Sequence, residues 1–290
     1  MKLCRYDQSC IGIVEGDRVF DITEEAAAAV RASPSPGRGD PLITALPQLK
    51  KRLPASLETL PSKLLPEVAL RSPVMAPSKI IAAPVNYKAH IEEMMNSPAA
   101  SGHALRDIDK AGLFLKANSS LAGPSEGVPI RFPQRRTDYE VELVAIIGKP
   151  GSDISRSEAL SYVAGYCLGI DITLRGTEDR SFRKSMDGYS IAGPWFVSAD
   201  EIPDPDNLEI SLSINGELRQ RANTRDMVFG VARLIEYASS FYTLHPGDLL
   251  YTGTPQGVGP IRPGDVIQAA GDGLGTMRIS VRAHAAGTGV

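Results

Sequence analysis

The fold of this chain is decided by the stretch Asp138-Tyr139-Glu140-Val141-Glu142-Leu143-Val144-Ala145-Ile146-Ile147. Alternate side chains of a β-strand point to the same face, so Glu140 and Glu142 are expected side by side. The run over 143–147 is apolar on both faces, which predicts a strand end buried inside a sheet. Two adjacent carboxylates repel each other unless a cation lies between them, and all-oxygen ligation suits Mg²⁺ or Mn²⁺, with Ca²⁺ as a substitute in crystals. The alternative is an amphipathic strand with one face in water.

A third acidic residue follows after one connection. The pattern Ser155-Arg156-Ser157-Glu158 is typical of a capping box and predicts a helix that continues over residues 159–168. Asp171 comes next, at a strand start or tight loop, where it is placed to supply a third metal ligand. Lys184 then lies in a polar, glycine-containing stretch that favours neither helix nor strand.

At this point the chain resembles a known family, the fumarylacetoacetate hydrolase (FAH) family, from about residue 79 to about residue 281. The motifs that carry the resemblance are Glu140-x-Glu142, Asp171-x-x-x-Arg175, Lys184-Ser185-x-Asp187-Gly188, Thr252-Gly253-Thr254-Pro255-x-Gly257-Val258-Gly259 and Pro263-Gly264-Asp265-Val266. The segment Asn86-Tyr87-x-x-His90-x-x-Glu93-Met94 resembles the branch with acylpyruvate hydrolases, oxaloacetate decarboxylases and 2-hydroxyhepta-2,4-diene-1,7-dioate isomerases. The resemblance implies an FAH-type β-roll, a homodimer, Mg²⁺ or Mn²⁺ on the three acids, and a mobile helix that supplies a His–Glu pair.

His90 and Glu93 are the candidate catalytic pair. A helix over residues 89–94 would place them at i and i+3 on one face. A carboxylate beside an imidazole fixes its tautomer and raises its basicity, which suits a general base. The alternative is a solvated helix with an accidental contact. The small, polar residues 96–102 that follow are a candidate lid over the substrate.

The resemblance also implies substrate-binding residues. Lys184 matches a lysine that contacts substrate, and Arg175 lines the same pocket with a glutamine whose position is Glu178 here. A carboxylate cannot donate a hydrogen bond unless it is protonated, so oxyanion stabilisation by Glu178 is in doubt. The alternative for Glu178 is an ion pair with Arg175 or Arg180, and plain surface charge is the alternative for Arg175 and Lys184.

Two further positions are expected at the same pocket. Thr252 matches a threonine that touches the substrate carboxylate, with a turn-capping hydroxyl as the alternative, and Tyr87 is predicted to bind substrate. Arg135 and Arg136 precede the acidic strand. They either read a second substrate carboxylate or only neutralise the acidic site.

Length and composition bound the remaining possibilities. The chain has 290 residues, 42% hydrophobic and 22% charged, which is typical of a globular protein. A net charge of −3 with no basic block argues against nucleic-acid binding. No apolar run predicts a signal peptide or a membrane span. Three cysteines without metal-type spacing suit free thiols in the cytoplasm, with Cys167 expected in a core helix.

The predicted organisation is a small α+β unit over 1–72 followed by a catalytic domain over 73–290, mixed α/β but predominantly β. Segments 11–14 and 18–22 predict a first hairpin around Glu15-Gly16-Asp17, followed by helices over 23–29 and 42–53 and a proline-rich linker. Later, segments 207–214 and 217–222 predict a second hairpin around Asn215-Gly216. An apolar helix over 227–242 is expected to contribute to a dimer.

The predicted function is a metal-dependent hydrolase that breaks a C–C bond in an acylpyruvate or related β-diketo acid, in aromatic-compound catabolism. Nucleophile-elbow and dinucleotide-binding motifs are incomplete, which disfavours serine and redox chemistry. One alternative is a decarboxylase or isomerase that acts through the same enolate on a 2-oxo or 2-hydroxy-dienoic acid. The other is a non-catalytic metal-binding module, in which His90 and Lys184 would have no role.

Overall fold

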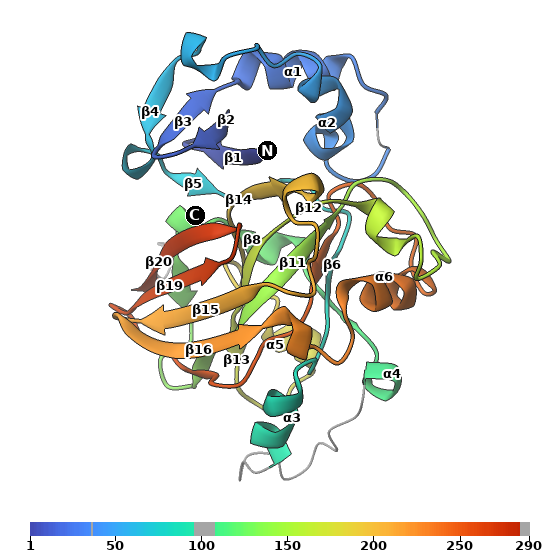
Figure 1. The fold of residues 1–290 in the computed structure, drawn as a ribbon. Helices are drawn as coiled ribbons and strands as arrows, with labels where there is room; N and C mark the ends of the chain where they lie inside the picture. Colours follow the sequence, from blue (N-terminus) through green and yellow to red (C-terminus); the bar gives the residue numbers. More distant parts are fainter. Residues whose placement is uncertain (36, 96–107, 285–290) are drawn as a thin grey trace, which may run out of the picture.

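The computed structural model of the protein describes residues 1–35, 37–95 and 108–284 (Figure 1). The candidate lid at 96–102 therefore lies outside the described residues. The elements are mostly strands, which confirms the predicted mixed, predominantly β class. No helix among the described residues has both the length and the apolar character needed to cross a membrane.

The largest sheet has twelve strands within the described ranges, in the order β4-β3-β2-β1-β14-β12-β11-β17-β6-β7, with β5 on β1 and β8 on β14. Its strands are β1 Lys2–Tyr6, β2 Cys10–Glu15, β3 Arg18–Asp21, β4 Ser62–Leu64, β5 Leu70–Arg71, β6 Ile80–Ala82, β7 Phe114–Lys116, β8 Leu121–Ala122, β11 Val141–Ile147, β12 Val163–Asp171, β14 Ser190–Ser198 and β17 Leu249–Tyr251. The central strands β11 and β12 are antiparallel neighbours that pair Glu142 with Gly169.

Two smaller sheets complete the catalytic part. One has the order β16-β15-β19-β20-β9 and forms the stack at the left of Figure 1; the other has the order β13-β10-β18. Their strands are β9 Val128–Ile130, β10 Thr137–Tyr139, β13 Thr173–Leu174, β15 Glu209–Ile214, β16 Glu217–Asn223, β18 Gly259–Pro260, β19 Val266–Gly271 and β20 Gly275–Ala283. Apolar side chains from the first of these sheets and from β11, β12 and β14 share one core cluster.

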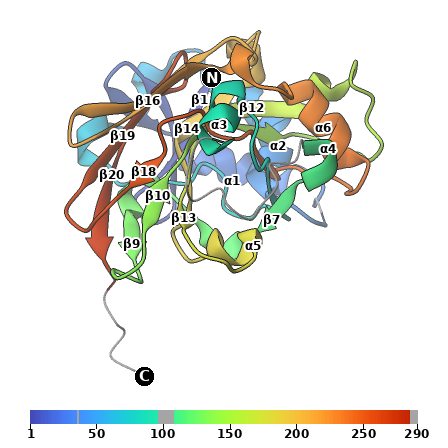
Figure 2. The same cartoon turned by 90° about the horizontal axis from the view of Figure 1, so that it is seen from below.

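The helices lie around these sheets. They are α1 Thr23–Arg31, α2 Pro41–Lys50, α3 Lys88–Met95, α4 Ile108–Ala111, α5 Arg180–Arg183 and α6 Val231–Ser239, with 3₁₀ turns at Leu57–Thr59, Leu65–Glu67, Asn118–Ser120, Pro124–Glu126, Ala159–Tyr162, Ala199–Glu201 and Thr224–Asp226. In Figure 1 α1 and α2 are at the top with β1–β3, and α3 is at the bottom. Figure 2, seen from below, shows α3 in front of the central strands.

The helix predicted over residues 159–168 is wrong. Only the 3₁₀ turn Ala159–Tyr162 forms, and the chain continues as β12 between β11 and β14. A Cβ at Gly165 would lie 2.2 Å from the Val197 carbonyl oxygen, so glycine permits the close strand contact there. A strand buried on both faces has the same continuous apolar run as a buried helix, which explains the error. Cys167 is buried as expected, but on this strand.

The predicted helix over 227–242 is shorter than expected. Gly230 occupies the N-cap of α6, and the helix ends at Ser239. Met227 instead forms an isolated β-bridge with Tyr87, which ties the start of this segment to the chain just before α3. The second hairpin is confirmed, because Asn215 and Gly216 have φ of 52° and 85°, as a type I′ turn requires.

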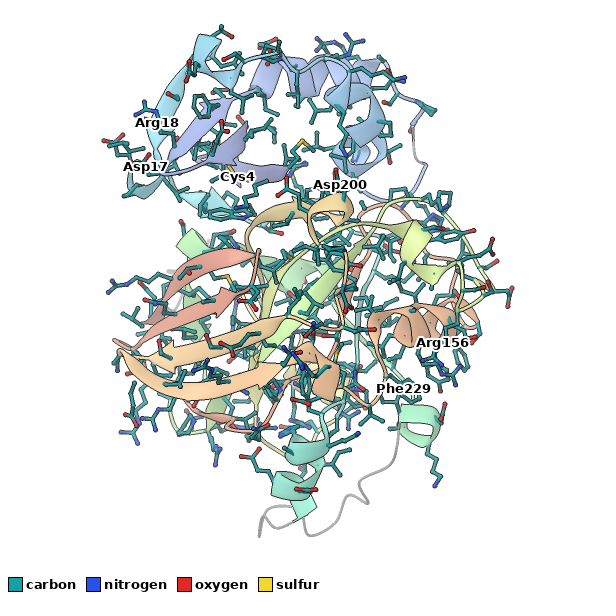
Figure 3. All side chains as sticks on the ribbon, viewed as in Figure 1. Cys4, Asp17, Arg18, Arg156, Asp200 and Phe229 are labelled. Carbon is teal, nitrogen blue, oxygen red and sulfur yellow. The ribbon has the colours of Figure 1, made fainter. Side chains whose placement is uncertain are left out.

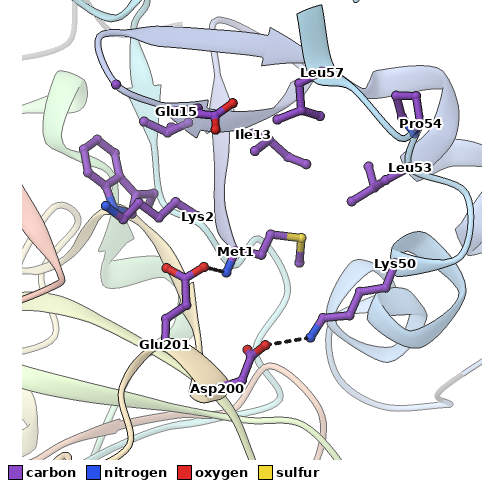
Figure 4. Close-up of a pocket in the computed structure, with 13 residues that line it drawn as sticks. Met1, Lys2, Ile13, Glu15, Lys50, Leu53, Pro54, Leu57, Asp200 and Glu201 are labelled. Carbon is purple, nitrogen blue, oxygen red and sulfur yellow. Dashed lines mark hydrogen bonds and ion pairs between the residues drawn. The ribbon is translucent and has the colours of Figure 1, made fainter.

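The N-terminal unit shares the central sheet with the catalytic part, because β1 pairs with β14 through Lys2 and Leu3. The first hairpin and both helices form close to their predicted bounds. Figure 4 shows a cavity of about 630 Å³ at this junction, crossed by an ion pair between Lys50 and Asp200. Figure 3 places Asp200 on the catalytic side of it. The division after residue 72 stays a prediction.

Candidate metal centre and catalytic site

The three predicted acids meet where β11 and β12 lie side by side. Glu140 connects β10 to β11, Glu142 is the second residue of β11, and Asp171 is the last residue of β12. All three are buried, and one carboxylate oxygen of each lies within 4.8 Å of the other two. The i, i+2 spacing and the antiparallel register therefore produce the cluster that the sequence predicted.

Nearby cations offset the charges of the acids unequally. Burial, followed by the negative charges of Asp171 and Glu140, raises the pKa of Glu142 well above its usual value. Burial also acts to raise the pKa of Glu140, but the charges of Lys184 and Arg175 outweigh it and lower that pKa to about 2. Hard oxygen donors at this spacing fit a divalent cation such as Mn²⁺ or Mg²⁺.

Lys184 follows α5 and reaches into the cluster. Its Nζ lies 2.7 Å from Glu140 Oε2, 2.7 Å from Asp171 Oδ2 and 2.6 Å from Thr173 Oγ1. All three ammonium donors are thus directed at protein oxygens, and the residue is buried. The structure confirms that Lys184 is not a plain surface charge, while its contact with substrate stays a prediction.

Lys116 is a site residue that the sequence analysis missed. It ends β7, is fully buried, and donates to Asp171 Oδ1 at 2.5 Å and to the Tyr189 carbonyl at 2.7 Å. Burial lowers its pKa, opposed by the charge of Asp171. A single lysine in a short apolar strand has no motif around it, so only the sheet order brings it to the acids.

Arg175 also faces the cluster. Its Nε lies 2.7 Å from Asp138 Oδ2 and its Nη2 lies 3.1 Å from Glu140 Oε1. Asp138 is buried and also accepts from Arg136 Nε at 2.7 Å. Arg175 therefore contacts one predicted metal ligand directly, and the surface-charge alternative for it is wrong.

The partner predicted for Glu178 is wrong. Both of its oxygens accept from the guanidinium of Arg135 at 2.8 Å, and the pair is exposed at the rim. Arg175 instead points inward and bonds Asp138, so its guanidinium is directed away from Glu178. The ion pair lowers the pKa of Glu178, so this position cannot act as a neutral hydrogen-bond donor.

The His90–Glu93 contact is present on α3. His90 Nδ1 lies 2.9 Å from Glu93 Oε2, and His90 is only 4% exposed. Glu93 Oε1 accepts from the backbone N–H of Gly257 at 3.1 Å, so one carboxylate orients the imidazole and fastens α3 to the loop after β17. The same loop also contacts Glu142 through the Gly253 N–H, so it links the His90–Glu93 pair to the acids.

The loop after β17 reaches the acids through its backbone. Gly253 donates its N–H to Glu142 Oε2 at 2.7 Å. Gly253 has a φ of 94°, and a Cβ there would lie 2.7 Å from Asn86 Cβ. Both the backbone conformation and the close contact therefore require glycine. Thr252 directs its hydroxyl to the Leu143 carbonyl at 2.9 Å. This bond joins the start of the loop to strand β11 and is not the turn-capping contact of the alternative; the substrate contact of Thr252 stays a prediction.

Asn86 and Tyr87 place α3 relative to this loop. The Asn86 side-chain amide donates to the carbonyls of Thr252 and Phe229 at 2.8 Å each, a structural role that the sequence did not reveal. Tyr87 is 1% exposed, and its hydroxyl finds no hydrogen-bond partner among the described residues. Burial, followed by the charge of Glu142, raises the pKa of Tyr87, so the group is a neutral phenol near the acids.

Gln220 is a second residue missed by the sequence analysis. From β16 it accepts from the Val141 N–H at 3.0 Å and donates to Thr254 Oγ1 and the Pro255 carbonyl at 2.9 Å each. It therefore joins the start of β11 to the glycine-rich loop. An alternating strand pattern marks it only as a polar position.

Comparisons with known proteins identify the family of the chain. The family description "Fumarylacetoacetate (FAA) hydrolase C-terminal" matches residues 79–282. The protein belongs to the fumarylacetoacetate hydrolase family. It is 51% identical over 288 residues to a maleylpyruvate hydrolase of Aquipseudomonas alcaligenes, covering 97% of this chain and 99% of that one. The family predicted from the motifs is thus confirmed.

Solved structures extend the likeness to the fold. The maleylpyruvate hydrolase of Sphingobium sp. SYK-6, in complex with manganese(II) and pyruvate, superposes with a TM-score of 0.81 at 36% identity, covering 98% of this chain and all of that one. A 2-hydroxyhepta-2,4-diene-1,7-dioate isomerase of Mycobacterium marinum gives 0.70 at 26% identity, with 98% of each chain covered. The rat mitochondrial oxaloacetate tautomerase Fahd2a is 36% identical over 79% of this chain and 71% of its own.

Proposed function

We propose that this metal-dependent hydrolase of the FAH family cleaves an acylpyruvate, such as maleylpyruvate, in aromatic-compound breakdown. Water adds to the acyl carbonyl, the bond from that carbon to the pyruvate methylene breaks, and a carboxylate and pyruvate result. The observation that carries the proposal is a loop after β17 that contacts Glu142, one of the three buried acids, and also Glu93, the partner of His90. The 51% identity to a maleylpyruvate hydrolase supports the substrate class.

The acids Glu140, Glu142 and Asp171 would hold Mg²⁺ or Mn²⁺. When bound there, the ion supplies Lewis-acid stabilisation for the negative charge that develops on the 2-oxo acid. Manganese(II) in the Sphingobium relative supports this choice for Mn²⁺, and the all-oxygen donor set supports Mg²⁺ equally.

His90 acts as the general base. Glu93 holds Nδ1, which leaves Nε2 as the ring nitrogen that takes a proton from the attacking water. The paired carboxylate also stabilises the imidazolium that results, as in other base–orienter pairs. Because the Gly257 N–H bonds Glu93, the loop after β17 and α3 together hold the imidazole in a fixed orientation.

Lysine and arginine side chains offset the charge of the site. Lys184 and Arg175 hold Glu140 in its ionised form and remain beside the point where the oxyanion and the enolate develop. Tyr87 offers a neutral hydroxyl donor that no described protein group takes up, and Thr252 shapes the loop next to it. These are the roles we propose for the substrate-binding residues; Glu178 would act only through Arg135.

A decarboxylase or isomerase reaction is the second candidate. The relatives named as an oxaloacetate tautomerase and a heptadiene-dioate isomerase favour it, since enolate chemistry is common to all three activities. Such reactions need the acids but not a water-activating base. A non-catalytic metal-binding module is disfavoured because it gives no role to Lys184, which contacts two of the acids, or to the buried His90 that Glu93 orients.

We further propose a homodimer in the cytoplasm. Phe241 lies just after α6, is 66% exposed, and makes an edge-to-face contact with Tyr237. An exposed aromatic side chain of this kind suits burial against a second copy of the chain. Three unpaired cysteines suit a reducing compartment. Light scattering should give twice the chain mass, and a monomer at micromolar concentration would contradict the dimer.

An assay of the purified, Mn²⁺-loaded protein against acylpyruvates, oxaloacetate and 2-hydroxymuconate-type acids tests the function. We expect pyruvate and the matching carboxylate from the acylpyruvates, with one oxygen of labelled water in that carboxylate. Turnover of oxaloacetate alone, with no acylpyruvate cleaved, would replace the hydrolase proposal by the decarboxylase one.

A further inference from the structure

Arg180 differs from the other arginines around the acids. Those have acceptors: Arg135 bonds Glu178, Arg136 and Arg175 bond Asp138, and Arg183 donates to the carbonyls of Leu174 and Glu178. The guanidinium of Arg180 has neither a hydrogen bond nor an ion pair with any residue that the structure describes, although its side chain is only partly exposed. A guanidinium has five N–H donors, and leaving them dehydrated without acceptors is costly.

The position of Arg180 is at the edge of the acidic site. Its Cζ lies 5.4 Å from the centroid of the Phe114 ring, and Lys184 Nζ lies 5.6 Å from the same centroid. Lys184 in turn contacts Glu140 and Asp171. Burial lowers the pKa of Arg180 while the charges of Glu140 and Asp171 oppose that shift, so the guanidinium is within electrostatic reach of both acids.

We propose that Arg180 binds a second, distal carboxylate of the substrate and so makes the enzyme selective for acylpyruvates whose acyl group ends in a carboxylate. This inference rests on the proposed function, because it takes the 2-oxo end of the substrate to lie at the three acids. A planar guanidinium matches a carboxylate through two parallel hydrogen bonds, which a lysine cannot reproduce. The ring of Phe114 beneath it holds the fork in place.

The two arginines singled out in the sequence are less suited to this task. Both Nη atoms of Arg135 already bond the two oxygens of Glu178. Arg136 has a side chain 54% exposed and donates its Nε to Asp138. An incoming carboxylate would have to displace these partners, whereas the guanidinium of Arg180 has none to displace among the described residues.

The test compares two acylpyruvates of matched shape. Succinylpyruvate carries the distal carboxylate, and 4-methylpentanoylpyruvate carries an isopropyl group in its place. In the Mn²⁺-loaded protein, Arg180→Met should lower kcat/KM for succinylpyruvate about 10- to 100-fold, mainly through KM. The same change should leave kcat/KM for 4-methylpentanoylpyruvate within about twofold.

Two further variants define the result. Arg180→Lys keeps the charge without the fork and should retain part of the selectivity. Arg31→Met removes an exposed arginine from α1 in the N-terminal unit. It should leave kcat/KM unchanged for both substrates. Thermal melting and Mn²⁺ affinity of each variant report folding, and Arg180→Gln replaces the methionine variant if that one does not fold.

The outcomes separate this inference from the function beneath it. Equal losses of kcat/KM for both substrates would mean that Arg180 only maintains the structure of the site, and would overturn the inference. No loss on either substrate would overturn it as well. If the wild-type protein cleaves neither acylpyruvate, the proposed hydrolysis is wrong and the inference falls with it. If it cleaves both and the ratio does not respond to Arg180→Met, only the inference fails.

Discussion

Buried carboxylates occur in two regions of this protein, and they differ in the donors that reach Glu142. At the joint between the N-terminal unit and the catalytic part, Asp40 is fully buried and accepts four backbone N–H bonds. Oδ1 accepts from the backbone N–H groups of Leu42 and Ile43 in α2. Oδ2 accepts from those of Met75 and Ala76 in the linker. Asp40 thus caps a helix and ties the linker to it.

Asp248 shows the same arrangement nearby. It accepts from Ser78 Oγ, from the N–H groups of Lys79 and His245, and from Lys79 Nζ at 2.6 Å. Every oxygen of these two carboxylates has donors supplied by the fold. Such acids hold the architecture together and leave nothing for a ligand.

Glu142 in the acid cluster is surrounded differently. Within the described residues it accepts a single hydrogen bond, from Gly253, and it faces the negative charges of Asp171 and Glu140, whose own oxygens accept from Lys184, Lys116 and Arg175. The comparison teaches that donor supply, more than burial, separates Glu142 from the structural carboxylates. Replacing an acid in each region should therefore give opposite results.

The largest effect is expected for Glu142→Gln. The amide keeps an acceptor for the Gly253 N–H but removes a ligand charge, so Mn²⁺ affinity should fall at least about 100-fold and hydrolysis with it. Without metal, the melting temperature should stay level or rise, because repulsion from Asp171 and Glu140 is relieved. Titration calorimetry and thermal melting measure both.

The exposed Glu24→Gln on α1 is the matched control and should change neither quantity. Wild-type protein should melt at a higher temperature when Mn²⁺ is added, and Glu142→Gln should lose that shift. A Glu142→Gln variant that binds Mn²⁺ as tightly as wild type would break the distinction between the two regions.

Asp40→Asn should do the reverse. An amide NH₂ would face two backbone N–H donors, so the free energy of unfolding should drop by about 2–4 kcal/mol and the melting temperature by several degrees. Mn²⁺ affinity and kcat should be unchanged, because no atom of Asp40 reaches the site. A loss of kcat in folded Asp40→Asn would mean that the joint and the site are coupled.

A smaller effect is expected for Glu93→Gln. The imidazole of His90 remains, but its orienting charge is lost and the Gly257 contact weakens, so kcat should fall about 10- to 100-fold. Mn²⁺ affinity should not change. Steady-state kinetics with an acylpyruvate measure the drop, and a fall in Mn²⁺ affinity of the same size would assign Glu93 to the metal centre.

The sequence predicts those parts of the site that depend on local geometry. The i, i+2 spacing of Glu140 and Glu142 and the i, i+3 spacing of His90 and Glu93 are set by strand and helix periodicity, and both predictions are confirmed as contacts. The Asn215-Gly216 turn is local in the same sense. Such features need no knowledge of how distant strands pair.

The parts that failed depend on non-local pairing. Lys116 and Gln220 reach the site only because β7 and β16 lie where the sheet order places them. The sequence of β12 predicts a helix because burial on both faces removes the alternation that distinguishes a strand. The predicted partner of Glu178 is wrong because Arg175 turns inward to the buried Asp138, which periodicity does not reveal.

The central claim is that the acids bind the metal while His90 activates water. Its most direct test measures Mn²⁺ affinity and acylpyruvate hydrolysis in one preparation of His90→Ala. We expect affinity to match wild type and kcat to fall about 10²- to 10⁴-fold, with any oxaloacetate decarboxylation less affected, because that reaction needs no base. Full hydrolysis by His90→Ala, or an equal loss of both activities, would contradict the assignment of His90 as the base.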